Sequence, residues 1–178
     1  MVASASSPLR LLIVEPNRAM LTVLARRFNE AGFRVIACER PDSALAELYR
    51  LPIDAIISEL RMVKVSGIDL IRLVRDNSMV RDTPMIMITG RSDATGAIDA
   101  FGAGADDVVA KPFDFSVLLA RVARRLARAR AVRELRADNA TLDARVVTRA
   151  IELGEARAAL KVSEDARVRL ETLMRRGG

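Results

Sequence analysis

Apolar residues follow two alternating patterns along the first two thirds of the chain. Five short runs are rich in branched side chains: residues 9–14, 33–37, 53–57, 85–88 and 107–110. Runs of this kind are typical of strands buried on both faces of a sheet. Between them, apolar residues recur at the spacing of amphipathic helices. The alternation predicts five strands, each followed by a helix, at intervals of about 20 to 25 residues.

This order predicts an α/β domain with a doubly wound, five-stranded parallel sheet and helices on both faces. The expected helix boundaries agree: Pro41 suits a first turn, Gly32 suits a helix end, and Ser66, Ser92 and Asp114 suit N-caps. Ligands of such sheets bind at the carboxyl ends of the strands. The residues at those ends are Glu15, Pro16, Ser58, Glu59, Thr89, Gly90 and Lys111.

The composition changes near residue 116. All 6 prolines and all 5 phenylalanines precede it, and the remainder is almost entirely Ala, Arg, Leu, Val and Glu, which favour helices. Only Gly154 weakens a continuous helix there, by about 1 kcal/mol relative to Ala. We therefore expect a disordered N-terminus over residues 1–7, a globular domain over 8–120 and a helical tail over 121–178.

The tail fits a heptad frame that runs from Leu118 to Met174. A helix of that length would extend about 85 Å, too far for a domain of this size to cover. We therefore expect a parallel homodimer that forms a coiled coil through the tail. Asn139 can fix a parallel register or be a defect, and Arg149 interrupts the apolar seam. The expected dimer seam consists of Val132, Leu135, Asn139, Leu142, Val146, Leu153 and Leu160.

Basic residues concentrate in the tail. The formal net charge is −1 over residues 1–120 and +7 over 121–178. A stripe on one helical face could contact nucleic acid or anionic lipid. The tail has no aromatic side chain for base stacking and its acidic residues are interleaved, so we expect a solvated face and no nucleic-acid binding. The basic stripe consists of Arg121, Arg124, Arg125 and Arg128.

Other residue counts exclude several kinds of chemistry. The chain has no histidine, which excludes histidine-based catalysis and a phosphohistidine of its own. Cys38 is the single cysteine, and its place in an apolar stretch indicates a small core residue. The apolar runs are far shorter than the roughly 18 residues of a membrane span. We expect a cytoplasmic protein with no membrane association.

Several sequence segments resemble the receiver domain of bacterial response regulators. They are Leu-Leu-Ile-Val-Glu-Pro-Asn at 11–17, the segment that ends in Ser-Gly at 54–67, Pro-Met-Ile-Met-Ile-Thr-Gly at 84–90, Gly-Ala-Asp-Asp at 104–107 and Lys-Pro-Phe at 111–113. They fall at the expected strand ends within residues 8 to about 120. The resemblance implies a flavodoxin-like receiver fold.

The resemblance also implies roles for the residues at the strand ends. In this family, an aspartate on the third strand accepts a phosphoryl group from a partner's histidine. Two acidic residues after the first strand hold Mg²⁺, and a Thr or Ser and a Lys contact the phosphoryl group. Thr89 and Lys111 match the last two positions. The phosphoacceptor position is Glu59, and the two acidic positions are Glu15 and Pro16.

These departures argue against phosphoryl transfer. Proline offers Mg²⁺ no ligand, and Mg²⁺ requires near-octahedral oxygen geometry, so we expect no cofactor. A Glu places its oxygens about 1 Å from those of an aspartate, an error that can cost about a hundredfold in rate. Val108 stands where the family commonly has an aromatic switch residue. The sequence therefore resembles a degenerate, pseudo-receiver type.

Together these features predict a non-enzymatic, phosphorylation-independent adaptor of a bacterial two-component pathway. Its expected partners are a histidine kinase or another signalling protein, and a second copy of the chain. Glu59, paired with Lys111 and Thr89, would imitate a phosphorylated site, or Glu15, Glu59 and Lys111 would form an inert ion cluster. Two further alternatives stay open: a phosphoacceptor regulator that uses Glu59, and a coiled-coil regulator that binds nucleic acid.

Overall fold

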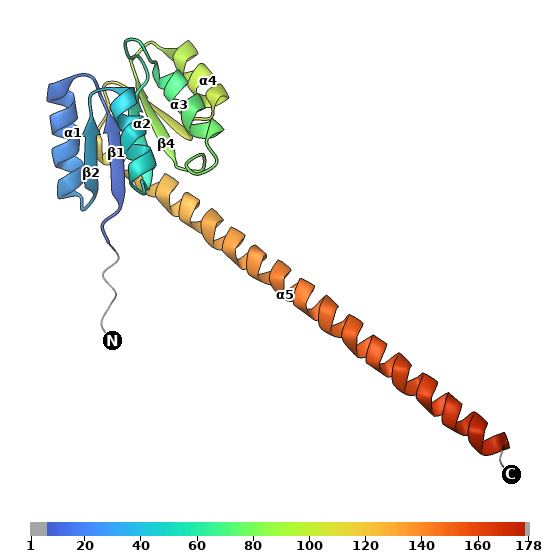
Figure 1. The fold of residues 1–178 in the computed structure, drawn as a ribbon. Coiled ribbons are helices and arrows are strands. Elements are labelled where there is room, and N and C mark those ends of the chain that lie inside the picture. Colours follow the sequence, from blue (N-terminus) through green and yellow to red (C-terminus); the bar gives the residue numbers. More distant parts are fainter. Residues whose placement is uncertain (1–6, 177–178) are drawn as a thin grey trace, which may run out of the picture. The chain divides into compact units, whose positions relative to one another are not determined.

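Strands and helices alternate along the chain (Figure 1). The computed structural model describes residues 7–176, so the expected disordered N-terminus lies outside the described residues except for Ser7. The strands are β1 (Arg10–Val14), β2 (Arg34–Cys38), β3 (Ala55–Glu59), β4 (Met85–Thr89) and β5 (Asp107–Ala110). The helices are α1 (Arg18–Glu30), α2 (Pro41–Arg50), α3 (Gly67–Asp76), α4 (Ala94–Ala103) and α5 (Phe115–Arg176).

The five strands form one parallel sheet in the order β2-β1-β3-β4-β5. Leu12 of β1 lies opposite Ile36 of β2 on one side and Ile56 of β3 on the other. The order changes direction between β1 and β3, which makes that boundary the switch point of a doubly wound sheet. The predicted flavodoxin-like fold is confirmed.

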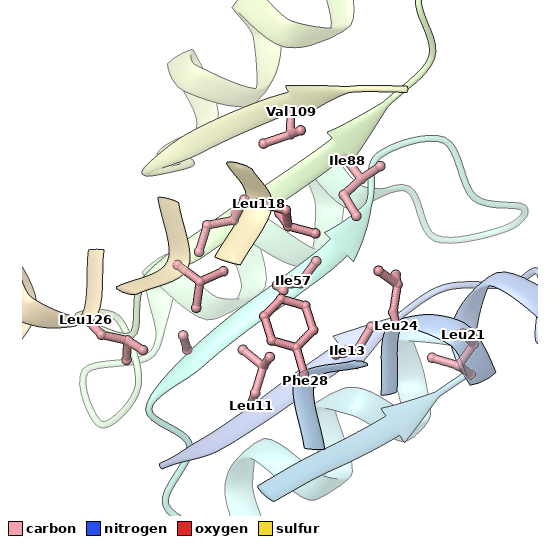
Figure 2. Close-up of a cluster of buried hydrophobic side chains, with 13 residues drawn as sticks. Leu11, Ile13, Leu21, Leu24, Phe28, Ile57, Ile88, Val109, Leu118 and Leu126 are labelled. Carbon is pink, nitrogen blue, oxygen red and sulfur yellow. The ribbon is translucent and has the colours of Figure 1, made fainter. Parts of the chain in front are cut away.

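The two faces of the sheet carry two separate hydrophobic cores, because successive strand residues point to opposite faces. Leu11 and Ile13 of β1 belong to one core, and Leu12 and Val14 belong to the other. The first core is closed by α1 and the start of α5, and Figure 2 shows Phe28 at its centre. The second core is closed by residues of α2, α3 and α4, namely Ala44, Leu48, Leu70, Ile71, Val74 and Ala100.

Four of the five strands begin or end one to two residues away from their predicted limits. Phe33 was predicted to begin β2, but its N–H donates to Phe28 O at 3.0 Å, and its ring packs edge-on against Phe28. Ile53 was predicted to begin β3, but the strand begins at Ala55. The chain bends at Asp54, whose carboxylate accepts the Arg10 N–H at 2.8 Å. The spacing of apolar residues does not reveal such local contacts, so it cannot predict the exact strand limits.

Helix ends follow the expected chemistry with one correction. Ser66 and Asp69 form a reciprocal capping box at the start of α3. Asp114 Oδ1 accepts the Ser116 N–H at 2.6 Å at the start of α5. The N-cap of α4 is Asp93 and not the predicted Ser92, because the Asp93 carboxylate accepts the Gly96 N–H.

The first turns of α5 belong to the globular domain. Chain contacts divide between Arg130 and Ala131, ten residues beyond the predicted limit at 120. Leu118 and Val122 are fully buried and Leu126 is 7% exposed, so all three complete the first core. Leu118 is therefore not available to a dimer seam, although the heptad frame began there.

From Ala131 onward, the α5 side chains that the structure describes are exposed. The helix continues through Arg149 and Gly154 without a break. Among the described residues, no helix combines the length and apolarity that a membrane crossing needs.

Candidate functional site

Two carboxylates and one ammonium group meet at the carboxyl ends of β1, β3 and β5. Lys111 Nζ donates to Glu15 Oε2 at 2.9 Å and to Glu59 Oε2 at 2.6 Å. Glu15 is 3% exposed and Glu59 is 9% exposed, whereas the Lys111 side chain is 30% exposed. These three residues were all expected at the carboxyl ends of the strands, and the structure brings their side chains into contact.

The remaining carboxylate oxygens bond to backbone N–H groups. Glu59 Oε1 accepts from Leu60 at 2.9 Å and from Arg61 at 3.2 Å. Glu15 Oε1 accepts from Asn17 at 2.9 Å. All four oxygens of the two carboxylates thus have a donor, which offsets the cost of burying them.

Lys111 remains protonated at neutral pH. Burial lowers its pKa, but the hydrogen bonds and charges of Glu59 and Glu15 outweigh burial, so the pKa of Lys111 lies above its ordinary value. With one ammonium group against two carboxylates, the cluster of Glu15, Glu59 and Lys111 has a formal charge of −1 when all three groups are ionised.

Close backbone packing holds Glu59 in place. The Gly67 N–H donates to Leu60 O at 2.9 Å, so α3 begins directly against the end of β3. A Cβ at position 67 would lie 2.7 Å from Glu59 O and 2.8 Å from Leu60 Cα. Only glycine permits this approach. On the other side, the Lys111 N–H donates to Thr89 O at 2.7 Å and fixes the start of the Lys111 loop.

Thr89 does not bond to Glu59, which corrects the expected grouping of Glu59 with Lys111 and Thr89. The Thr89 hydroxyl donates to Asp93 Oδ2 at 3.0 Å instead. Arg61 donates to the same carboxylate through Nε and Nη2, at 2.7 Å each. The pKa of Asp93 lies well below its ordinary value, chiefly because of the hydrogen bond from Arg61.

Sequence reasoning missed Arg61 and Asp93. Asp93 stands four residues after the matched threonine and just before a predicted helix, so it could have been recognised as an alternative N-cap to Ser92. Arg61 carries no such signal, because its bond to Asp93 spans 32 residues and depends on how two loops meet.

Pro16 and Val108 flank the site in separate clefts. Pro16 lines a cleft of about 470 Å³ together with Arg61, Met62 and Val63. Val108 is half-buried and lines a cleft of about 260 Å³ next to Thr89 and Phe101.

The donor set does not suit Mg²⁺. Glu15 and Glu59 already share the Lys111 ammonium group, and Pro16 has no side-chain oxygen. Among the residues whose side chains the structure describes, no group of three or more His, Cys, Asp or Glu is placed to hold a metal ion.

The predicted dimer seam is exposed along the tail. Leu135, Leu142 and Leu153 are 63%, 55% and 52% exposed. Val132, Val146 and Leu160 are exposed as well, and so is Asn139. The structure contains one copy of the chain, and the homodimer stays a prediction.

The predicted basic stripe is divided by Asp107. Arg121 Nη1 donates to Asp107 Oδ1 at 2.8 Å, and Arg125 Nη2 lies 3.4 Å from Asp107 Oδ2. Asp107 is 7% exposed, so it draws two of the four arginines toward the receiver surface. Arg124 and Arg128 are exposed.

The sequence of this domain matches a known family. Residues 11–123 match the model of the response regulator receiver domain. The chain belongs to that family, as its resemblance predicted, and the family supports a role in two-component signalling.

Similar proteins include several named regulators. The chain is 35% identical over 122 residues to the phosphate regulon transcriptional regulatory protein PhoB of Rhizobium meliloti, covering 68% of this chain and 53% of that protein. It is 32% identical over 141 residues to the sensory transduction protein RegX3 of Mycolicibacterium smegmatis, covering 79% of this chain and 60% of that protein. The chain thus spans about half the length of the curated relatives it matches.

Solved structures support the same fold. A putative response regulator from Chloroflexus aurantiacus is 32% identical, with a TM-score of 0.65, covering 67% of this chain and 98% of that chain. A response regulator receiver domain protein from Clostridium thermocellum is 21% identical, with a TM-score of 0.65, covering 70% of this chain and 98% of that chain, and supports the fold alone.

Proposed function

We propose that this receiver is a phosphorylation-independent adaptor in two-component signalling. The Lys111 ammonium group carries the proposal, because it bonds to Glu15 at 2.9 Å and to Glu59 at 2.6 Å and so engages an oxygen of each carboxylate. Every oxygen of both carboxylates has a donor. A carboxylate bonded in this way is a weak nucleophile.

Glu59 serves as a fixed negative charge. One carboxylate supplies about one negative charge against nearly two for a phosphoryl group, so the imitation is partial. A histidine kinase or another signalling protein binds the surface around this charge. The inert-cluster alternative assigns the same three residues to stability alone.

The tail supplies the second partner, another copy of the chain. Its exposed apolar residues recur at coiled-coil spacing, and a parallel homodimer through residues 131–174 would cover them. The apolar residues of the expected seam are between 38% and 67% exposed, so the side chains of a second helix could pack against them.

Labelling with acetyl phosphate tests the adaptor against the phosphoacceptor alternative. Incubation of the full chain with acetyl phosphate and Mg²⁺ should add no phosphoryl mass, read by intact mass spectrometry. Mg²⁺ alone should leave the melting temperature unchanged, because a ligand stabilises only a native state that binds it. Phosphorylation at Glu59 would overturn the proposal.

Two variants separate the fixed charge from the missing metal ligand. The double change Glu59→Asp with Pro16→Asp should restore Mg²⁺ binding and some labelling. Glu59→Asp alone should not, because Pro16 still leaves the metal one ligand short. Glu59→Gln should weaken capture of the natural partner, whereas equal capture would favour the inert cluster.

A nucleic-acid regulator is the remaining alternative, and the name of PhoB as a transcriptional regulatory protein gives a reason to test it. Arg121, Arg124 and Arg128 are exposed, and of these three Arg121 is paired with Asp107. Duplex DNA should show no specific mobility shift at physiological salt. Specific binding whose logarithm falls with log salt by about 0.9 per phosphate contact would favour the alternative.

A further inference from the structure

A cleft of about 660 Å³ lies between α1 and the segment that joins β5 to α5. Its volume falls within the range of about 300 to 1,000 Å³ that is typical of small-molecule sites, and most of its lining is apolar or aromatic, as in such sites. We call it the α1–α5 cleft. Its apolar lining consists of Met20, Val23, Leu24, Pro112, Phe113 and Phe115.

We propose that the α1–α5 cleft binds a free amphipathic carboxylate, a small molecule with an apolar or aromatic body and one carboxylate group. The body packs against the apolar lining. The carboxylate pairs with Arg91, and the charge of Arg27 adds to the attraction. This inference goes beyond the adaptor function, because neither carboxylate of the adaptor site, Glu15 or Glu59, lines the cleft.

The charge of the cleft favours an anion. Three cationic side chains line it, Arg27, Arg91 and Lys111, and none of the described residues that line it is acidic. Lys111 already donates to two carboxylates, those of Glu15 and Glu59. The two arginines therefore supply the positive charge that remains for a ligand.

Arg91 is the accessible cation of the cleft. It lies in the loop between β4 and α4, is exposed, and has no hydrogen bond or ion pair through its side chain among the described residues. Its planar fork can accept a carboxylate through two parallel hydrogen bonds without giving up an existing partner. The pKa of the neighbouring Asp114 is lowered chiefly by a hydrogen bond from the Ser116 backbone and least by the charge of Arg27, so Arg27 is not committed to that carboxylate.

The second arginine is held in place by an aromatic side chain. The guanidinium carbon of Arg27 lies 4.6 Å from the centroid of the Phe115 ring. The Phe115 ring packs in turn against the ring of Phe28 in the first core, with their centroids 4.9 Å apart. An arginine stacked in this way is already ordered, which reduces the conformational entropy lost when a ligand binds.

The apolar lining explains why the ligand needs more than a charge. Val23 is 44% exposed on α1, and Met20 and Phe113 are half-buried. Leu24 is 2% exposed and connects this lining to the first core. Covering the exposed side chains removes apolar surface from water, which favours binding of a ligand with an apolar body.

Titration of the full chain with 2-naphthoate tests the site. We expect saturable binding with a Kd of about 1 mM or lower, seen as shifts of the Val23, Arg27 and Phe113 amides in two-dimensional NMR spectra. Naphthalene-2-carboxamide has the same shape without the charge, and acetate has the charge without the apolar body. Each should bind at least about fivefold more weakly. Equal binding of the acid and the amide would mean that the cleft takes any apolar group, such as a partner's helix, and would overturn the proposal.

Removal of the accessible cation gives the second test. Arg91→Gln should weaken 2-naphthoate binding by about fivefold and leave carboxamide binding unchanged. Arg26→Gln is the matched control, because Arg26 is an exposed arginine of α1 that pairs with Glu30 and does not line the cleft. The control should leave both ligands unchanged. An Arg91→Gln protein that binds 2-naphthoate as tightly as the wild type would contradict the assignment.

An added acid gives the sharpest test. Val23→Asp should abolish the 2-naphthoate shifts, because a carboxylate in the cleft repels the ligand and interrupts the apolar lining. Thr22→Asp adds the same charge at the neighbouring exposed position outside the lining and should change the Kd by less than about twofold. Equal losses in the two variants would indicate a general charge effect and overturn the site. The assay contains no phosphoryl donor, so its failure would leave the adaptor proposal intact.

Discussion

The two stretches of α5 on either side of Arg130 have similar compositions and different surroundings. Leu118 is fully buried and Leu126 is 7% exposed, whereas Leu135 and Leu142 are 63% and 55% exposed. Ala, Arg, Leu and Val dominate both stretches. The difference lies in the sheet, whose first core accepts three residues of the early stretch. Composition predicts the helix, and only the tertiary contacts reveal where its structural role changes.

Truncation should produce the largest contrast between the two stretches. A chain that ends at Arg130 keeps Val122 and Leu126 and should unfold in urea at the midpoint of the full chain. A chain that ends at residue 120 loses both and should be destabilised by at least about 3 kcal/mol, since each buried aliphatic side chain contributes about 1.5 to 3 kcal/mol. Equal midpoints would show that the early stretch is not part of the core.

A matched pair of leucine substitutions gives the next largest effect. Leu118→Ala should lower the free energy of unfolding of the receiver by about 3 kcal/mol, because it leaves a cavity in a close-packed core. Leu142→Ala should change it by less than about 0.5 kcal/mol and should instead weaken self-association. Urea unfolding and sedimentation at several concentrations separate the two effects. A Leu142→Ala protein that associates as the wild type does would contradict the predicted seam.

Asp107 offers a polar test of the same contrast. Asp107→Ala removes the acceptor shared by Arg121 and Arg125 and should cost about 1 to 2 kcal/mol. The Arg125 Nε is already buried without a hydrogen-bond partner, so the arginine has little to replace the lost bond. Glu47→Gln, in an exposed pair with Arg50, should cost less than about 0.5 kcal/mol and serves as the control.

Low pH should destabilise the receiver by less than the substitutions above. Hydrogen bonds, chiefly from the Ser66 side chain, lower the pKa of Asp69. Hydrogen bonds, chiefly from the Ser116 backbone N–H, lower the pKa of Asp114. A carboxyl group with a lowered folded-state pKa stabilises the fold above its ordinary value of about 3.9, and this stability is lost as pH falls through the folded-state value. Melting temperature should therefore fall below about pH 4, and less steeply in Asp114→Asn. An identical acid profile in Asp114→Asn would contradict this account.

The sheet could be predicted from sequence because each of its five strands coincides with a short apolar run, and β1, β3 and β4 are almost entirely buried. Strand limits could not, since Phe33 and Asp54 are held by contacts specific to this packing. The end of the receiver was misplaced for a related reason. Nothing in the residues between 120 and 130 marks which helical turns the sheet covers.

The cluster of Glu15, Glu59 and Lys111 was predictable because parallel strands end at one edge of the sheet. The bonding of Thr89 was not. Its partner is the Asp93 carboxylate, which also accepts hydrogen bonds from Arg61 of another loop. The rule that parallel strands end at one edge of the sheet predicts which residues lie near one another. It does not predict which of several nearby acceptors receives the hydrogen bond of a hydroxyl group.

The close approach at Gly67 has a consequence for mutation. Because a Cβ there would meet the backbone of Glu59 and Leu60, any other residue would displace the end of β3 or the start of α3. In a library of all single substitutions, position 67 should tolerate no replacement, whereas the exposed Val63 on the same loop should accept most. Backbone contact therefore limits position 67 to glycine, whereas position 63, four residues earlier, can hold nearly any amino acid.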